Sequence, residues 1–86
     1  MTKITVFKKD YVTELVKIIR NAKNAQVLQK HLANYHDKDV AEAITRLNET
    51  ERIRLYTMIG TPRLAEIFSY LDDAKPYLDE LSLDKA

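Results

Sequence analysis

Apolar residues recur every three or four positions along most of this chain, which is the spacing of amphipathic α-helices. Asp10 can cap a first helix. The apolar positions of that helix are Tyr11, Val12, Leu15, Val16, Ile18 and Ile19. A polar stretch at residues 21–24 interrupts the pattern, and Asn24 can cap a second helix. The apolar stripe of the second helix consists of Val27, Leu28, Leu32 and Tyr35.

Three further helix starts are marked by capping residues. Asp39 and Asn48 are each followed three residues later by a glutamate, which is the arrangement of a capping box. Thr61 precedes Pro62, and proline suits the first helical position because its missing N–H would have no helical partner there. Pro76 fits the first turn of a last helix but not a helix interior. The signals predict helices at 39–47, 49–59, 62–71 and 75–83.

Apolar residues near the helix ends recur every 12 residues. One ladder consists of Tyr35, Leu47, Ile59, Leu71 and Leu83. A second ladder consists of Ile44, Tyr56 and Phe68, and it is broken at the next position by Glu80. At twice this interval, residues 41–49 resemble residues 65–73.

Twelve residues make one short helix and a corner, and units of this size stack on their neighbours to bury a continuous core. Short helices of similar length could match by chance, but the agreement of caps, ladders and corners favours a repeat. We therefore predict an all-α solenoid of about six short helices. Because such helices are marginal alone, we expect Leu47, Ile59 and Leu71 to be buried in the core.

The composition limits both the architecture and the chemistry. Gly60 is the only glycine and cysteine is absent, which excludes phosphate-cradling glycine loops, disulfides and thiolate metal sites. The longest apolar stretches have two or three residues, whereas a membrane span needs roughly 20. We therefore expect a chain that is not inserted in a membrane. We also expect residues 1–9 to form an N-terminal arm, a candidate for disorder, and residues 10–86 to form a single helical-repeat domain.

Charge is distributed unevenly along the chain. Residues 1–36 carry seven Lys and Arg against two acids, a net charge of +5, and residues 66–86 carry two Lys against six acids, a net charge of −4. A basic front half can indicate nucleic-acid binding, and an acidic tail can indicate cations or basic partners. Solvated helix faces are the simpler explanation of both. No arginine-rich recognition helix or aromatic platform accompanies the lysines, so we expect no nucleic-acid partner.

Candidates for catalytic chemistry are few. His31 and His36 are five residues apart, which does not place them on one helix face as a zinc pair would require. Adjacent acids at residues 72–73 and 79–80 are typical of helix starts, where they complement the helix dipole. No serine, threonine or histidine stands in a recognisable catalytic signature. We therefore expect a chain that is not an enzyme and that works by docking to a partner.

Three segments carry a family resemblance. Residues 36–47 read His-Asp-Lys-Asp-Val-Ala-Glu-Ala-Ile-Thr-Arg-Leu, residues 51–52 are Glu-Arg, and residues 62–72 read Pro-Arg-Leu-Ala-Glu-Ile-Phe-Ser-Tyr-Leu-Asp. They resemble the N-terminal cytoplasmic domain of MgtE-type magnesium transporters, whose pattern is similar to H-x-x-D-[IV]-A-E-x-[IL]-x-x-L, then E-R, then a proline-started helix with A-E-[VI]-[LF]-x-x-L-[DS]. The resemblance is good over residues 25–73 and weaker at both ends. A related helical repeat occurs in a flagellar motor-switch protein, and other solenoids could mimic it.

The resemblance implies a right-handed superhelix attached to a pair of CBS domains and a magnesium-conducting membrane domain, on the cytoplasmic side of the membrane. In that family Mg²⁺ bridges acidic surfaces of the cytoplasmic parts, and high magnesium compacts them and closes the pore. Mg²⁺ takes few protein ligands per ion, and a shared cation replaces like-charge repulsion with attraction. We therefore expect a regulatory module that binds Mg²⁺ weakly at a domain interface. Its expected partners are the CBS-domain and membrane-domain portions, in the same or another chain, with a homodimer formed through the transporter.

The same resemblance points to candidate magnesium ligands. Glu66 stands where the family places an interface glutamate that helps to bind Mg²⁺, and Asp72 and Asp73 are further candidates. A solvated helix glutamate accounts for Glu66 equally well. Asp39 and Glu42 match the family too, but we interpret them as capping residues.

The C-terminal end departs from the family pattern. Pro76 and Glu80 make the last repeat irregular, and the chain ends about where family members begin another helix. We expect a domain truncated at this end, either as part of a longer protein or as a free-standing relative whose partner is another chain. The alternative function is a helical scaffold that binds a protein partner without metal.

Overall fold

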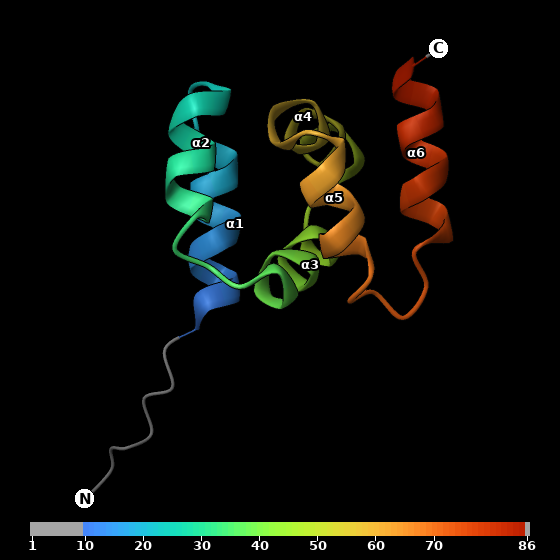
Figure 1. The fold of residues 1–86 in the computed structure, drawn as a ribbon. Coiled ribbons are helices and arrows are strands. Elements are labelled where there is room, and N and C mark those ends of the chain that lie inside the picture. Colours follow the sequence, from blue (N-terminus) through green and yellow to red (C-terminus); the bar gives the residue numbers. More distant parts are fainter. Residues whose placement is uncertain (1–9, 86) are drawn as a thin grey trace, which may run out of the picture.

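The computed structural model describes residues 10–85, and within them it contains six α-helices and no strands (Figure 1). The helices are α1 (Tyr11–Asn21), α2 (Ala25–Leu32), α3 (Asp37–Arg46), α4 (Glu49–Ile59), α5 (Thr61–Phe68) and α6 (Lys75–Lys85). The all-α prediction is therefore confirmed. The predicted arm at residues 1–9 lies outside the described residues, and so does the side chain of Leu83 within α6.

Three of the predicted caps hold their helices as expected. The Asp10 carboxylate accepts hydrogen bonds from the Thr13 backbone N–H at 3.0 Å and the Thr13 hydroxyl at 2.6 Å, and these bonds lower the pKa of Asp10. Asn24 accepts from a backbone N–H at the start of α2. Asn48 and Glu51 form a reciprocal capping box at the start of α4. These side chains satisfy N–H groups that have no partner inside their helices.

The prediction that Asp39 caps α3 is wrong. The N-cap is His36, whose Nδ1 accepts the backbone N–H of Lys38 at 3.0 Å. The helix is already under way at Asp39, because the N–H of Asp39 donates to the carbonyl of His36 at 2.9 Å. Glu42 therefore cannot close a capping box on Asp39, and its side chain is exposed on the surface of α3.

The boundaries of α5 also differ from the prediction. Its N-cap is Gly60 rather than Thr61, with a φ of 95°, a conformation that glycine adopts without the clash that a side chain would cause. The helix ends at Phe68, three residues before the predicted end. At that end the Ser69 hydroxyl donates to the carbonyl of Glu66 at 2.6 Å, and turn-type bonds carry the chain to Leu71. Residues 72–74 therefore belong to the α5–α6 connection.

Helices pack mainly against the helix two positions along the chain. α1 contacts α3, α2 contacts α4, α3 contacts α5, and α4 contacts α6. This is the nearest-neighbour packing of a solenoid. In Figure 1, α1 and α2 stand at one end of the array and α6 at the other. The right-handed sense of the array stays a prediction.

The 12-residue ladders describe the core. Leu47 and Ile59 are buried as predicted, and so are all three apolar members of the second ladder. Leu71 is only partly buried against this core, because α5 ends before it and it lies in the connection. The prediction for Leu71 is therefore correct only in part.

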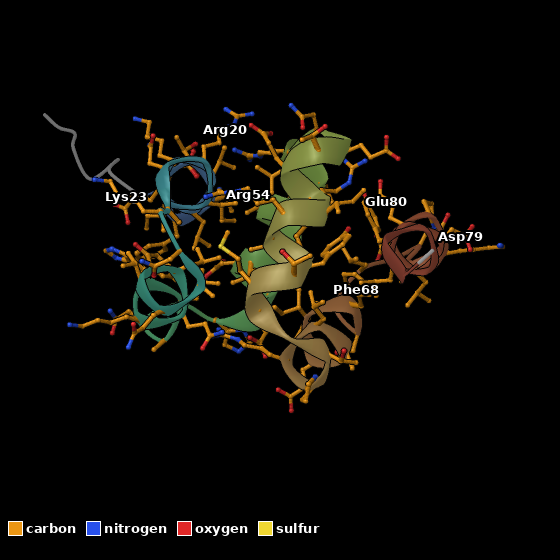
Figure 2. The ribbon with its side chains drawn as sticks, turned by 90° about the horizontal axis from the view of Figure 1, so that it is seen from above. Arg20, Lys23, Arg54, Phe68, Asp79 and Glu80 are labelled. Carbon is orange, nitrogen blue, oxygen red and sulfur yellow. The ribbon has the colours of Figure 1, made fainter. Side chains whose placement is uncertain are left out.

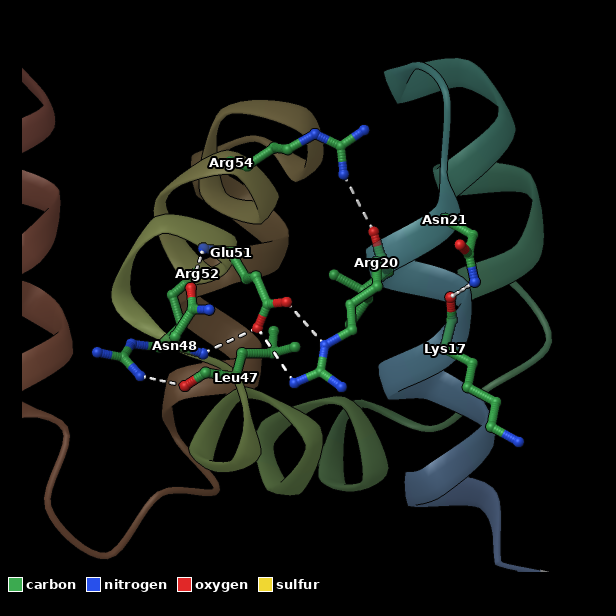
Figure 3. Close-up of polar contacts among 9 residues, drawn as sticks. Lys17, Arg20, Asn21, Leu47, Asn48, Glu51, Arg52 and Arg54 are labelled. Atoms are coloured by element: carbon green, nitrogen blue, oxygen red, sulfur yellow. Dashed lines mark hydrogen bonds and ion pairs between the residues drawn. The ribbon is translucent and has the colours of Figure 1, made fainter.

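Three arginines each bind the end of an earlier helix, which the sequence analysis missed. Arg54 donates to backbone carbonyls at the end of α1, and Arg52 donates to the carbonyl of Leu47 after α3 (Figure 3). Arg63 donates to the carbonyl of Leu32, at the end of α2, at 3.0 Å. The last carbonyls of a helix lack helical partners and carry the negative end of its dipole. Each arginine therefore satisfies one helix end from a later helix.

Candidate acidic docking surface

Glu66, the first predicted magnesium ligand, lies on the exposed face of α5. Its neighbours Leu64 and Ile67 are buried, so the helix turns Ala65 and Glu66 towards solvent. Among the described contacts, the carboxylate of Glu66 has no hydrogen bond and no ion pair. A carboxylate in this position is available to a ligand or a partner.

Asp72 and Asp73 lie in the α5–α6 connection. One carboxylate oxygen of Asp73 accepts the backbone N–H of Lys75 at 3.2 Å, where α6 begins. Asp72 is exposed, and the described contacts assign its carboxylate no partner. One of the two aspartates thus shapes the helix start, and the other extends the acidic surface.

A groove of about 310 Å³ brings these aspartates beside α3. Its lining residues are Lys38, Ala41, Glu42, Thr45, Tyr70, Leu71, Asp72, Asp73 and Tyr77. The groove therefore combines three carboxylates and one ammonium group with apolar and aromatic walls. Glu42, which the sequence analysis assigned to capping, belongs to this groove, whereas Glu66 does not line it.

The aromatic wall is fixed at the edge of the groove. Tyr70 is 50% exposed, and its ring packs edge-on against His36, with the centroids 5.5 Å apart. His36 itself caps α3, so the contact couples the start of α3 to the end of α5. The groove is thus built across two helices and a connection that are far apart in sequence.

The position of the connection depends on how α6 is attached to α4. Glu80 is only 8% exposed and points from α6 towards the body of the molecule, whereas Asp79 points away (Figure 2). Arg52 donates to the Glu80 carboxylate from Nε at 3.0 Å and from Nη2 at 2.6 Å, and the Tyr56 hydroxyl donates to it at 2.9 Å. A buried carboxylate is stable only when it is paired and hydrogen-bonded in this way. We call Arg52, Tyr56 and Glu80 the α6 lock.

Within the α6 lock, the positive charge of Arg52 and burial have opposite effects on the pKa of Glu80. The hydrogen bonds from Arg52 lower the pKa of the Glu80 carboxyl and outweigh the effect of burial, which would raise it. Burial, and then the hydrogen bond to Glu80, raise the pKa of the Tyr56 hydroxyl. Glu80 is therefore ionised and Tyr56 is neutral near pH 7. The negative charge of Glu80 is used inside the fold and is not part of the acidic surface.

The three predicted ligands do not form a complete metal site. Among the residues that the structure describes, no three His, Cys, Asp or Glu side chains come together as a metal-ligating group. Mg²⁺ commonly keeps several waters and takes only one or two protein carboxylates. The carboxylate oxygens of Glu66, Asp72 and Asp73 are of the ligand type that Mg²⁺ prefers, although Glu66 lies outside the groove that the two aspartates line.

Comparison with known proteins assigns this arrangement to a family. The family model of the MgtE intracellular N domain matches residues 35–86, which is more than half of the chain. The chain belongs to this family. It is therefore an N-terminal domain of the MgtE type, as the sequence resemblance implied. No curated protein and no solved structure matches the chain.

The family match and the resemblance cover different ranges. The match begins at Tyr35 rather than near residue 25, and it extends to residue 86. It therefore includes α3 to α6, with the groove, Glu66 and the α6 lock, and leaves α1 and α2 outside. No helix in the described part of the chain has the length and apolarity that a membrane span requires.

Sequence reasoning missed Arg52, Tyr56 and Glu80 as a unit, although one signal pointed to them. Glu80 follows Phe68 by 12 residues, at the position where the ladder requires a buried side chain. An acid at a core position implies a buried partner. That inference could have predicted the lock, but not which of the four arginines in residues 37–65 would pair with Glu80, because Arg52 lies 28 positions away along the chain.

Proposed function

We propose that this domain is a non-catalytic regulatory module in the cytoplasmic part of a magnesium transporter. It takes part in Mg²⁺-dependent gating by docking to CBS domains through its acidic surface. The observation that carries the proposal is membership of the MgtE intracellular N domain family, because this family match includes the helices that bear the acidic surface. The domain supplies carboxylates and a partner supplies the rest of each ion site.

The charge of the acidic surface supports a role for a bridging cation. Glu66 and Asp72 have no cationic partner among the described contacts, and Glu42, Asp72 and Asp73 share one groove with the single ammonium group of Lys38. Two acidic surfaces repel one another until a cation lies between them. Only a cation that binds the docked state more tightly than the separated state can shift the equilibrium between the two. Magnesium meets this condition when both surfaces contribute ligands to it.

An NMR titration of the chain with Mg²⁺ tests the ion-binding half of the proposal. We expect weak, saturable shifts of the amides around Glu66, Asp72 and Asp73 at millimolar Mg²⁺, because each site lacks its partner ligands. The combined substitution Glu66→Gln and Asp72→Asn should remove these shifts. Glu49→Gln, an exposed acid at the start of α4, is the matched control and should leave them unchanged. Flat amide spectra up to millimolar Mg²⁺ would contradict the proposal.

A binding assay with a separate CBS-domain portion tests the docking half. Binding that requires Mg²⁺ and disappears with chelator supports the regulatory module. Binding that a chelator does not change would instead support the alternative function, a helical scaffold that recognises a protein without metal. That alternative is favoured by one observation, namely that the groove has apolar and aromatic walls as well as carboxylates.

A further inference from the structure

The surface of α1 and α2 has features that the proposed function does not use. A groove of about 260 Å³ lies between these helices, and its walls are mostly apolar. The lining residues are Lys17, Ile18, Asn21, Ala22, Val27 and His31. Val27 is 40% exposed in this groove, whereas Leu28 and Leu32 of the same helix are buried. We call this surface the front groove.

The front groove has a positively charged rim. Lys17, Lys23 and Lys30 are exposed, and the described contacts assign none of them a carboxylate partner. Arg20, by contrast, is neutralised by Glu51 at 2.7 Å, as Figure 3 shows. Lys23 lies in the connection before α2, and Val27 and Lys30, three residues apart on α2, share one face of that helix. The rim would attract an acidic surface that carries an apolar side chain.

The other end of the array presents such a surface. Leu78 on α6 is 50% exposed, and the next residue, Asp79, points away from the molecule (Figure 2). Asp72 and Asp73 precede this helix. Lys75 offsets part of the charge through a 3.3 Å pair with Asp79, but the pair is exposed and therefore weak. We call Leu78 and these three aspartates the rear surface.

The two surfaces lie at opposite ends of the helix array, so one chain cannot join them to each other (Figure 1). We propose that the rear surface of one copy docks in the front groove of a second copy, head to tail, with Leu78 against Val27 and the aspartates against the lysine rim.

A second copy of this chain fits the front groove better than an unrelated partner, because the chain itself carries both complementary surfaces. Among the described side chains, the front exposes three lysines without a carboxylate partner and the rear exposes three aspartates against Lys75, and each surface exposes one large aliphatic side chain. Opposite surface charges orient the encounter of two molecules, and apolar contact then holds the complex. The two surfaces differ, so the contact is heterologous and can continue from copy to copy. This association needs no metal and uses α1 and α2, which lie outside the family match, although its rear surface shares Asp72 and Asp73 with the acidic surface of the proposed function.

Sedimentation equilibrium of the whole chain with two blocking variants tests the proposal. At low ionic strength, the weight-average mass should rise with concentration above the 10.0 kDa of one chain. Val27→Asp and Leu78→Asp should each reduce it to that of a monomer. An equimolar mixture of the two variants should form dimers that grow no further, because the intact rear surface of the first meets the intact front groove of the second. Raising the salt to about 0.5 M should weaken the association, because the Debye length falls to a few ångströms.

Each other outcome overturns the proposal. A parent chain that stays monomeric at every concentration shows that the surfaces do not bind each other. A variant that still associates alone shows that like surfaces pair or that other residues are used. A mixture that stays monomeric excludes the head-to-tail geometry. Thr50→Asp, at an exposed position on α4, is the control for added charge and should behave like the parent, and circular dichroism confirms that every variant is folded.

Discussion

The two terminal helices of the described array are held by different forces. α1 buries three aliphatic side chains in the core, namely Leu15, Val16 and Ile19. On α6, by contrast, the buried side chain among those described is the carboxylate of Glu80. Tyr77 and Leu81 of α6 are only partly buried against the core. One end of the array is therefore attached by packing, and the other depends on a charge.

This difference shows how one repeat position can serve two purposes. Ile44, Tyr56, Phe68 and Glu80 are successive members of a 12-residue ladder, and all four are buried. The first three are stabilised by removal of apolar surface from water. Glu80 must lose its hydration, and only Arg52 and Tyr56 offset that cost. The attachment of α6 therefore depends on ionisation of Glu80. The position of the acidic groove depends on it too, because the α5–α6 connection lines that groove.

Truncation of the apolar ladder should have the largest effect. Leu47→Ala removes a side chain that is 4% exposed, and we expect it to lower the free energy of unfolding of the whole chain by about 2–5 kcal/mol. Leu71→Ala is the matched control in the same ladder and should cost less, because Leu71 is only partly buried. Urea unfolding measures both. A Leu47→Ala midpoint equal to that of the parent would contradict the buried ladder.

Breaking the α6 lock should have a smaller effect on the whole chain and a selective effect on α6. Arg52→Ala leaves the Glu80 carboxylate without its cation, and we expect a loss of about 1–3 kcal/mol. The loss is limited because detachment of α6 returns Glu80 to water. Hydrogen exchange should become faster in α6 and stay slow in α1. Arg20→Ala, which breaks an exposed pair, should leave α6 protected.

Acidification should also detach α6, but less completely than Arg52→Ala. The pKa of Glu80 is lowered in the folded chain, so the ionised form is favoured by folding. This contribution is complete above the ordinary pKa of a glutamate and disappears as the pH falls through the lowered value. The protection factors of the α6 amides, which correct for the slower intrinsic exchange at acid pH, should therefore fall as the pH is lowered, more steeply than those of α1. In Glu80→Gln this difference in pH dependence should be absent, and its persistence there would show that another group is responsible.

Much of the fold could be predicted because its signals are local. The caps at Asp10, Asn24 and Asn48 act on N–H groups three residues away, and the apolar spacing is visible within one or two turns. The errors occurred where two local signals competed. His36 caps α3 in place of Asp39, and Gly60 precedes α5 in place of Thr61, and in both cases more than one residue near the boundary could start the helix.

The candidate site was predictable only in part. Sequence resemblance identified Glu66, Asp72 and Asp73 as acids to examine, and it did so without information about their surroundings. Glu66 lies on the exposed face of α5, whereas Asp72 and Asp73 line the groove, because α5 ends before them. The apolar pattern did not reveal this early end of α5. Glu42 joined the groove because α3 lies beside the α5–α6 connection, and that contact is not encoded near Glu42.

The sequence by itself determined that this chain is a row of short helices with a basic front and an acidic rear. These properties depend on residue identity and on neighbours within about four positions along a helix. Tertiary structure alone decided which charges remain on the surface. The carboxylate of Glu80 is paired with residues 24 and 28 positions away, whereas the carboxylates of Asp72 and Glu66 stay available to a ligand. The reason is physical: the free energy of a charge depends on the groups that surround it in space, and those are brought together only when the helices pack.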